Sequence, residues 1–140
     1  MHRFMKTTAV VFAGALLLSG CSASGGGDAS ASADPCETVR VEVRNISNGA
    51  QNTLATATDP DATVEYLDGL EERVDALGEQ ADGDAKLDDA LDGLQGALEG
   101  ASEYAATISA DAEQDADALA AQQTAIQEAA ANVTEVCSAK

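Results

Sequence analysis

Three cysteines and one histidine have the greatest potential for covalent or metal chemistry in this 140-residue chain. The histidine is His2, and the cysteines are Cys21, Cys36 and Cys137. Zinc sites group four nitrogen and sulfur ligands closely, so distant thiols without a nearby histidine are poor ligands. A catalytic thiol pair more often has the close Cys-x-x-Cys spacing. We therefore expect neither a metal site nor a cofactor.

Residue combinations typical of nucleophilic catalysis are also missing. Serine and threonine are scattered through a segment without histidine, and Lys86 and Lys140 have no neighbours suited to activating them. Carboxylates are so numerous, at 25 Asp and Glu, that a pair of them indicates nothing specific. The sequence predicts that the protein is not an enzyme.

The charge balance restricts the partners. Seven Lys and Arg against 25 Asp and Glu give a net charge of −18. Nucleic-acid binding requires a basic surface that neutralises phosphates, so we expect no nucleic-acid partner. Two Asp-rich segments suggest calcium, but the first places Val64 where an EF-hand loop needs glycine, and the second places Lys86 at a ligand position. We interpret Asp59, Asp82 and Asp84 as helix caps.

The first 21 residues have the organisation of an export signal. Residues 1–6 are positively charged, and residues 7–18 form an apolar run too short to span a bilayer. The following Leu18-Ser19-Gly20-Cys21 resembles a bacterial lipobox. The resemblance implies cleavage after residue 20 and diacylglycerol on the Cys21 thiol, which anchors the chain to the outer face of the cell membrane. The alternative is an ordinary signal peptide with Cys21 free.

Residues 21–34 form a predicted tether between the membrane and a folded domain. The segment is rich in Gly, Ser and Ala, which makes it flexible. Its typical reach is roughly 20 Å, and its limit is about 45 Å. The sequence thus divides into a signal peptide (1–20), a lipidated tether (21–34) and an acidic helical domain (35–140).

The two remaining cysteines predict a disulfide. Cys36 and Cys137 lie near opposite ends of the domain, and an even pair in an exported protein is typically bonded.

Hydrophobic periodicity predicts four helices, at 35–57, 60–81, 84–108 and 110–137. Asp34 caps the first, Asp59-Pro60 separates the first from the second, and Ser109 precedes the fourth. Alternation of valines at 39–43 leaves a short strand as an alternative there. The expected core stripes are Val39, Val43, Ile46, Ala50, Leu54 and Ala57; Leu67, Leu70, Val74, Leu77 and Ala81; Leu87, Leu91, Leu94, Leu98, Ala101, Ala105 and Ile108; and Ala112, Ala116, Leu119, Gln123, Ile126, Ala130, Val133 and Cys137.

Four amphipathic helices joined by short turns predict an all-α, antiparallel up-down-up-down bundle. In this topology the beginning of the first helix and the end of the fourth lie together, as the Cys36–Cys137 bond requires. Two separate hairpins or an oligomeric coiled coil would not need that bond.

Two surface features of the predicted helices suggest binding. An acidic strip on the second helix is a candidate docking site for a basic envelope protein or for loosely bound cations, and the simpler interpretation is a solvated face of an acidic extracellular protein. Three glycines on the third helix, opposite its leucines, are either a solvent face or a close docking face. The strip contains Glu65, Asp68, Glu72, Asp75 and Glu79, and the glycines are Gly93, Gly96 and Gly100.

The lipobox, tether and Ala/Asp-rich helices framed by two cysteines resemble small lipid-anchored or secreted helical proteins of high-GC Gram-positive bacteria. That resemblance implies no activity. We expect a lipid-anchored interaction or structural module. The alternative is a binding protein for cations or a small ligand, or an inhibitor of an envelope enzyme. A bundle cavity lined by Gln123, Tyr66 or Tyr104 would favour that alternative.

Overall fold

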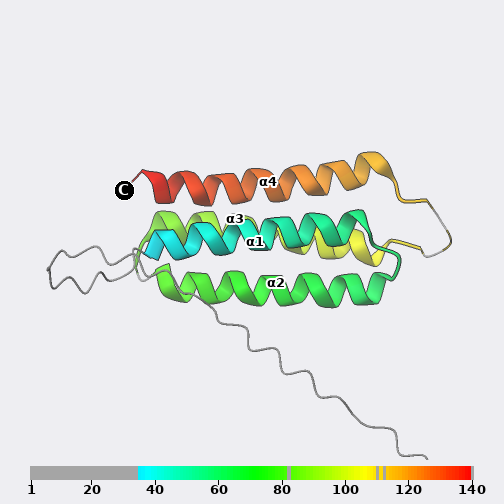
Figure 1. Ribbon diagram of the computed structural model, residues 1–140, viewed down its shortest axis with the longest axis horizontal. Helices are drawn as coiled ribbons and strands as arrows, with labels where there is room; N and C mark the ends of the chain where they lie inside the picture. Colours follow the sequence, from blue (N-terminus) through cyan, green and yellow to red (C-terminus); the bar gives the residue numbers. More distant parts are fainter. Residues whose placement is uncertain (1–34, 82, 110, 112, 140) are drawn as a thin grey trace, which may run out of the picture. The chain divides into compact units, whose positions relative to one another are not determined.

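The described part of the chain is entirely helical. The computed structural model describes residues 35–81, 83–109, 111 and 113–139, and these contain four helices and no strand (Figure 1). The helices are α1 (Pro35–Ala55), α2 (Pro60–Ala81), α3 (Ala85–Ala106) and α4 (Ala116–Ser138). The all-α prediction is confirmed, and the alternative strand at 39–43 is wrong because these residues belong to α1.

Aspartate side chains cap three of the helices. The Asp59 carboxylate accepts a hydrogen bond from the Ala62 amide at 3.2 Å. Asp84 accepts from the amides of Lys86 and Leu87 at 3.2 and 3.3 Å. These bonds satisfy amides that have no partner inside the helix. The cap interpretation of Asp59 and Asp84 is confirmed, whereas Asp34 and Asp82 lie outside the described residues.

The predicted beginning of the fourth helix is wrong. Residues 113–115 are not helical, and Asp115, rather than Ser109, is the N-cap of α4, with bonds to the amides of Asp117 and Ala118. Gln114 donates from Nε2 to the Ala57 carbonyl, at 2.8 Å. This contact with the segment after α1 replaces a local helical turn with a longer connection.

Two other helix ends differ by two residues from the prediction. α1 ends at Ala55 instead of 57, and Thr56 turns back to donate its hydroxyl to the Asn52 carbonyl. α3 ends at Ala106 instead of 108, with Thr107 as its C-cap. Such fraying is common where the last carbonyls are satisfied by local turns.

The core follows the predicted stripes closely on three helices. Every predicted apolar residue within α1, α2 and α3 is buried, and Ile108, beyond the end of α3, is partly buried. On α4, Leu119, Gln123 and Ala130 are only partly buried, and Ala116 is exposed, which differs from the prediction. The fourth helix therefore contributes little large apolar surface to the core. Its buried residues are Ile126, Val133 and Cys137.

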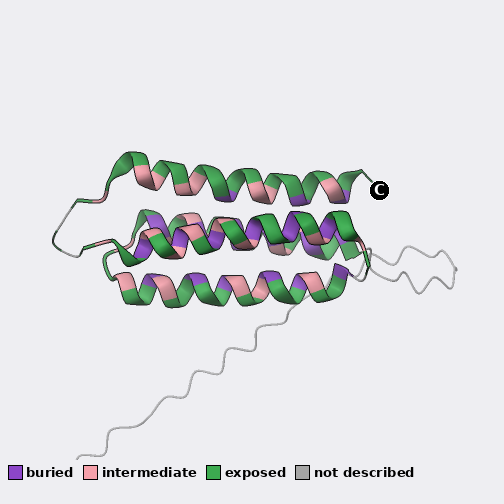
Figure 2. Ribbon diagram, turned by 180° about the vertical axis from the view of Figure 1, so that it is seen from behind, coloured by how far each residue is buried: buried purple, intermediate pink, exposed green. Residues whose placement is uncertain are grey.

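The helices form one bundle in which the buried residues face inward (Figure 2). α1 packs against α2 and α4, and α3 packs against the same two helices. The described residues contain no helix that is long and apolar enough to cross a membrane.

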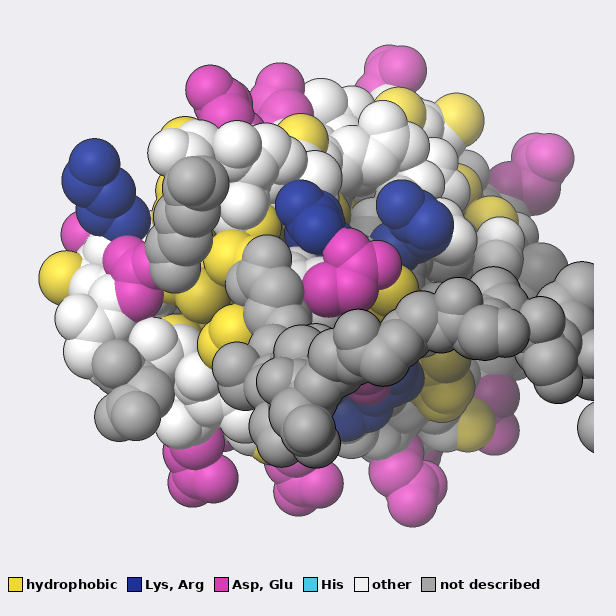
Figure 3. All heavy atoms as spheres, turned by 60° about the vertical axis from the view of Figure 1, so that its left-hand side comes forward, with side chains coloured by type: hydrophobic (Ala, Val, Ile, Leu, Met, Phe, Trp, Pro, Cys, Tyr) yellow, Lys and Arg dark blue, Asp and Glu magenta, His cyan; other side chains and the backbone are white. Residues whose placement is uncertain are grey.

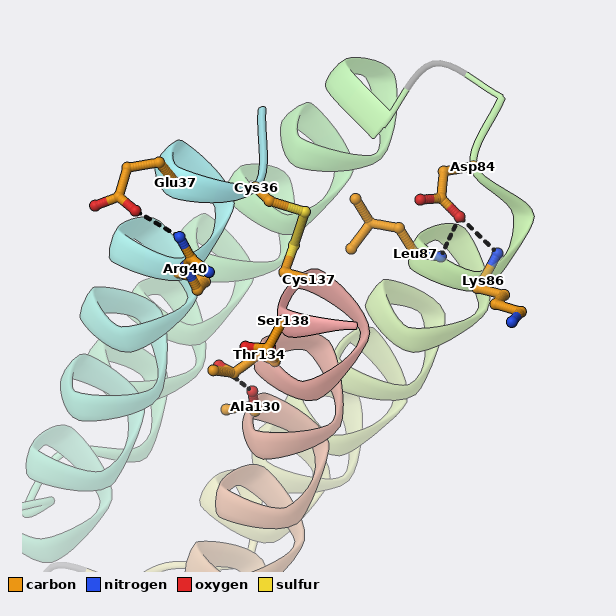
Figure 4. The surroundings of a disulfide bond; sticks show 10 residues. All are labelled: Cys36, Glu37, Arg40, Asp84, Lys86, Leu87, Ala130, Thr134, Cys137 and Ser138. Atoms are coloured by element: carbon orange, nitrogen blue, oxygen red, sulfur yellow. Dashed lines mark hydrogen bonds and ion pairs between the residues drawn. A yellow bond between two sulfur atoms is a disulfide. The ribbon is translucent and has the colours of Figure 1, made fainter. Parts of the chain in front are cut away.

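Cys36 and Cys137 form the predicted disulfide. Their Cα atoms are 5.2 Å apart, within the usual range for this bond. The bond joins the beginning of α1 to the end of α4, and both cysteines are buried (Figure 4). It closes a loop with a sequence separation of 101 residues.

Candidate functional site

The acidic strip lies on the solvent face of α2. All of its five carboxylates are exposed, and Arg73 of the same helix turns away from them to α1, where its Nε donates to Glu42 Oε1 at 2.8 Å. The strip therefore has no cationic partner within α2, and its charge is open to solvent. Its members are Glu65, Asp68, Glu72, Asp75 and Glu79.

Glu71, which the sequence analysis did not single out, lies beside this strip between α2 and α3. The Ser102 hydroxyl donates to its carboxylate across the two helices, at 3.5 Å. Partial burial, followed by repulsion from Asp68 and Glu99, raises the pKa of Glu71 above its usual range. No sequence pattern indicates this, because Glu99 and Ser102 come close only through packing.

The three glycines on α3 do not share one environment. A Cβ atom added at Gly93 or Gly96 would meet no atom within 4 Å, so both positions are open. Gly100 is half-buried, and its added Cβ would lie 3.4 Å from Oε1 of Gln122 on α4. The predicted docking face is thus an open surface at two positions and an edge of the α3–α4 interface at the third.

The polar residues proposed to line a bundle cavity lie apart. Tyr66 is 45 % exposed, and its hydroxyl rests over Gly49 of α1. Tyr104 lies near the end of α3, where its hydroxyl donates to the Asp115 carbonyl at 3.5 Å. Gln123 is half-buried on α4. The structure does not bring these three together.

A groove between α1 and α4 is a hollow that the sequence did not predict. It has a volume of about 390 Å³ and is lined by side chains from residues 40–48 of α1 and 130–138 of α4. Two of its lining residues, Arg40 and Arg44, are four positions apart and therefore share one face of α1. The sequence shows the spacing of Arg40 and Arg44, but the α4 side of the groove depends on the tertiary structure.

No group of three or more His, Cys, Asp or Glu residues that could hold a metal ion occurs in the part of the chain that the structure describes. Gln95 has a buried Oε1 atom without a hydrogen-bond partner among these residues. It lines a small hollow between α2 and α3, together with Asp75, Asp88 and Asp92.

The lipidation prediction falls on Cys21, which lies outside the described residues. The sequence matches no protein-family model, and neither a curated protein nor a solved structure shows significant similarity to it.

Proposed function

We propose that this chain is a bacterial lipoprotein, anchored through Cys21 to the extracytoplasmic face of the cell membrane, that acts as an interaction or structural module without catalysis. The observation that carries the proposal is the Leu18-Ser19-Gly20-Cys21 sequence, placed between an apolar run and a flexible Gly/Ser/Ala segment. The Cys36–Cys137 disulfide supports export, because such bonds persist in oxidising compartments. The resemblance to small lipid-anchored or secreted helical proteins of high-GC Gram-positive bacteria supports a place in the cell envelope.

We infer in addition that the bundle has the antiparallel up-down-up-down topology. Contacts between neighbouring helices support it. In each pair of helices, a contact made further along the first helix reaches a residue nearer the beginning of the second. Between α1 and α4, Cys36 bonds to Cys137 and Gln51 to Gln127. Between α1 and α2, Glu42 pairs with Arg73, and Gly49 lies under Tyr66. The predicted tether, residues 21–34, then joins the helical domain next to Cys36.

The exposed acidic strip supports a basic protein of the envelope as the partner. Charge complementarity accelerates encounter and selects partners, and the arginine on the same helix, Arg73, pairs with Glu42 of α1 and not with the five carboxylates. Like charges at these spacings oppose helix formation by a few tenths of a kcal/mol per pair. A bound basic partner or loosely bound cations would remove that cost.

The lipid anchor is tested by the Cys21→Ser variant expressed in a high-GC Gram-positive host. The wild-type chain should fractionate with membranes and acquire the mass of a diacylglyceryl group. The variant should be released into the medium or remain unprocessed. Membrane attachment of a mature-sized Cys21→Ser protein would contradict the proposal.

The interaction role is tested by crosslinking on intact cells followed by mass spectrometry. Changing Glu65, Glu72 and Glu79 to Gln should abolish crosslinks to a basic partner. The matched control changes three exposed glutamates away from the strip, Glu103, Glu113 and Glu128, so that the net charge is identical. Equal loss of crosslinks in both variants would show that overall charge, rather than the strip, recruits the partner.

A further inference from the structure

We propose that the groove between α1 and α4 is a binding site for a phosphate group. In a chain with seven basic residues, two arginines, Arg40 and Arg44, line one groove of about 390 Å³. Figure 3 shows one face of the molecule on which basic side chains lie among acidic ones, so a groove lined by two arginines is unusual on so acidic a surface. The proposal does not depend on the lipid anchor.

Arg44 supplies the available positive charge. Among the described residues the ion pairs join Arg40 to Glu37, at 2.6 Å, and Arg73 to Glu42. No described carboxylate lies within ion-pairing distance of Arg44. A guanidinium presents several donors in a planar fork that matches phosphate oxygens, so Arg44 is suited to a bidentate contact.

Neutral donors stand beside Arg44 on the same helix. Ser47 and Asn48 both line the groove. Ser47 ends a directional chain of hydrogen bonds, in which Gln127 donates to Gln51 at 2.8 Å and Gln51 donates to Ser47 at 3.0 Å. Because Ser47 accepts in this chain, its own hydroxyl hydrogen remains to be donated. A phosphate has enough oxygens to use the guanidinium, hydroxyl and amide donors together, which favours it over a carboxylate.

The α4 side of the groove contributes contact area but no free hydroxyl donor. Thr134 and Ser138 lie on the side of α4 that faces Arg40 (Figure 4). Their hydroxyls donate to the carbonyls of Ala130 and Thr134, at 3.0 and 2.8 Å, so these hydrogens are already used. Val43 and Ala131 add apolar lining that fits the carbon portion of a phosphate ester.

Glu135 opposes an anion, because its carboxylate lines the same groove. Glu37 also opposes an anion, because it pairs with Arg40 and offsets its charge. The two arginines and these two glutamates sum to zero formal charge, so binding depends on the donors of Arg44, Ser47 and Asn48, and we expect it in the millimolar range for inorganic phosphate. Removing the charge of Arg44 should therefore weaken phosphate binding, and removing the charge of Glu135 should strengthen it.

The experiment is a titration of the full chain in zwitterionic detergent with inorganic phosphate and then glycerol 3-phosphate, at constant ionic strength. Backbone and arginine side-chain chemical shifts report the site. Saturable shifts should be confined to residues 40–48 and 130–138. Arg44→Gln should weaken binding about five- to ten-fold. Lys86→Gln removes the same charge at an exposed position outside the groove and should leave binding unchanged.

Glu135→Gln should tighten binding about two- to five-fold, whereas Glu128→Gln, at an exposed position of the same helix, should not. A second arm replaces the soluble esters with vesicles of phosphatidylcholine, with or without phosphatidylglycerol. Binding in the vesicle arm that Arg44→Gln removes would identify a lipid headgroup as the source of the phosphate, and binding only of soluble esters would identify a soluble ligand. Absence of saturable shifts in both arms, or equal effects of Arg44→Gln and Lys86→Gln, would overturn the proposal.

Discussion

Loss of the Cys36–Cys137 disulfide should remove a large part of the stability of the four-helix bundle. The perturbation is the double variant Cys36→Ala and Cys137→Ala, in a Cys21→Ser chain so that no third thiol is present. Alanine is preferable to serine because both cysteines are buried, at 1 % and 4 % exposed, and a hydroxyl there would need a hydrogen-bond partner.

The expected magnitude follows from the length of the loop that the bond closes. A sequence separation of 101 residues corresponds to about 4.7 kcal/mol of chain entropy at 25 °C. A domain of this size typically has a total stability of roughly 5–15 kcal/mol. Much of this core is alanine, and α4 buries only Ile126, Val133 and Cys137. The bond therefore supplies a third or more of the total, and its loss should lower the melting temperature by roughly 20 to 35 °C.

Urea unfolding followed by circular dichroism measures the difference directly. The oxidised chain, the same chain with reductant, and the alanine variant are compared in one buffer. The reduced chain and the alanine variant should agree within about 1 kcal/mol, since both lack the cross-link and differ only in two sulfur atoms. A loss of stability below about 1 kcal/mol in both would refute the chain-entropy reasoning.

Three further predictions concern charge and the open glycines. Because the pKa of Glu71 is raised by folding, its contribution to stability is present below its ordinary value of 4.5 and is lost as pH rises through the folded value. Glu71→Gln should therefore stabilise the bundle at pH 7 but not at acid pH in thermal melts, with the exposed Glu128→Gln, which has no acidic neighbour at helical spacing, as control. Gly93→Ala and Gly96→Ala should each raise the free energy of unfolding by about 0.5–1 kcal/mol, whereas Gly83→Ala, at a φ of +87°, should lower it. Added NaCl should raise the melting temperature by screening the net charge of −18, and a fall would contradict self-repulsion as a destabilising force.

The sequence by itself determined the helical class, most of the core and the disulfide pair. Periodicity identified the buried faces of α1, α2 and α3 because a leucine or valine stripe at helical spacing has one energetically favourable orientation, toward the core. Asp59 and Asp84 were identifiable as caps because capping depends on amides two or three residues away. Because the lipobox resemblance implies that Cys21 carries lipid, Cys36 and Cys137 were the two cysteines left to pair.

Contacts between distant segments decided the rest. The beginning of α4 shifted to Ala116 because Gln114 bonds to Ala57, a contact across 57 positions that no local pattern encodes. The burial of Glu71 depends on α3, and the α1–α4 groove depends on which face of α4 closes it. An alanine-rich helix such as α4 has a weak hydrophobic stripe, so its orientation is set by its neighbours and by the Cys137 bond. Local periodicity therefore fixes a helix only where large apolar side chains define its inner face, and packing decides the orientation of the others.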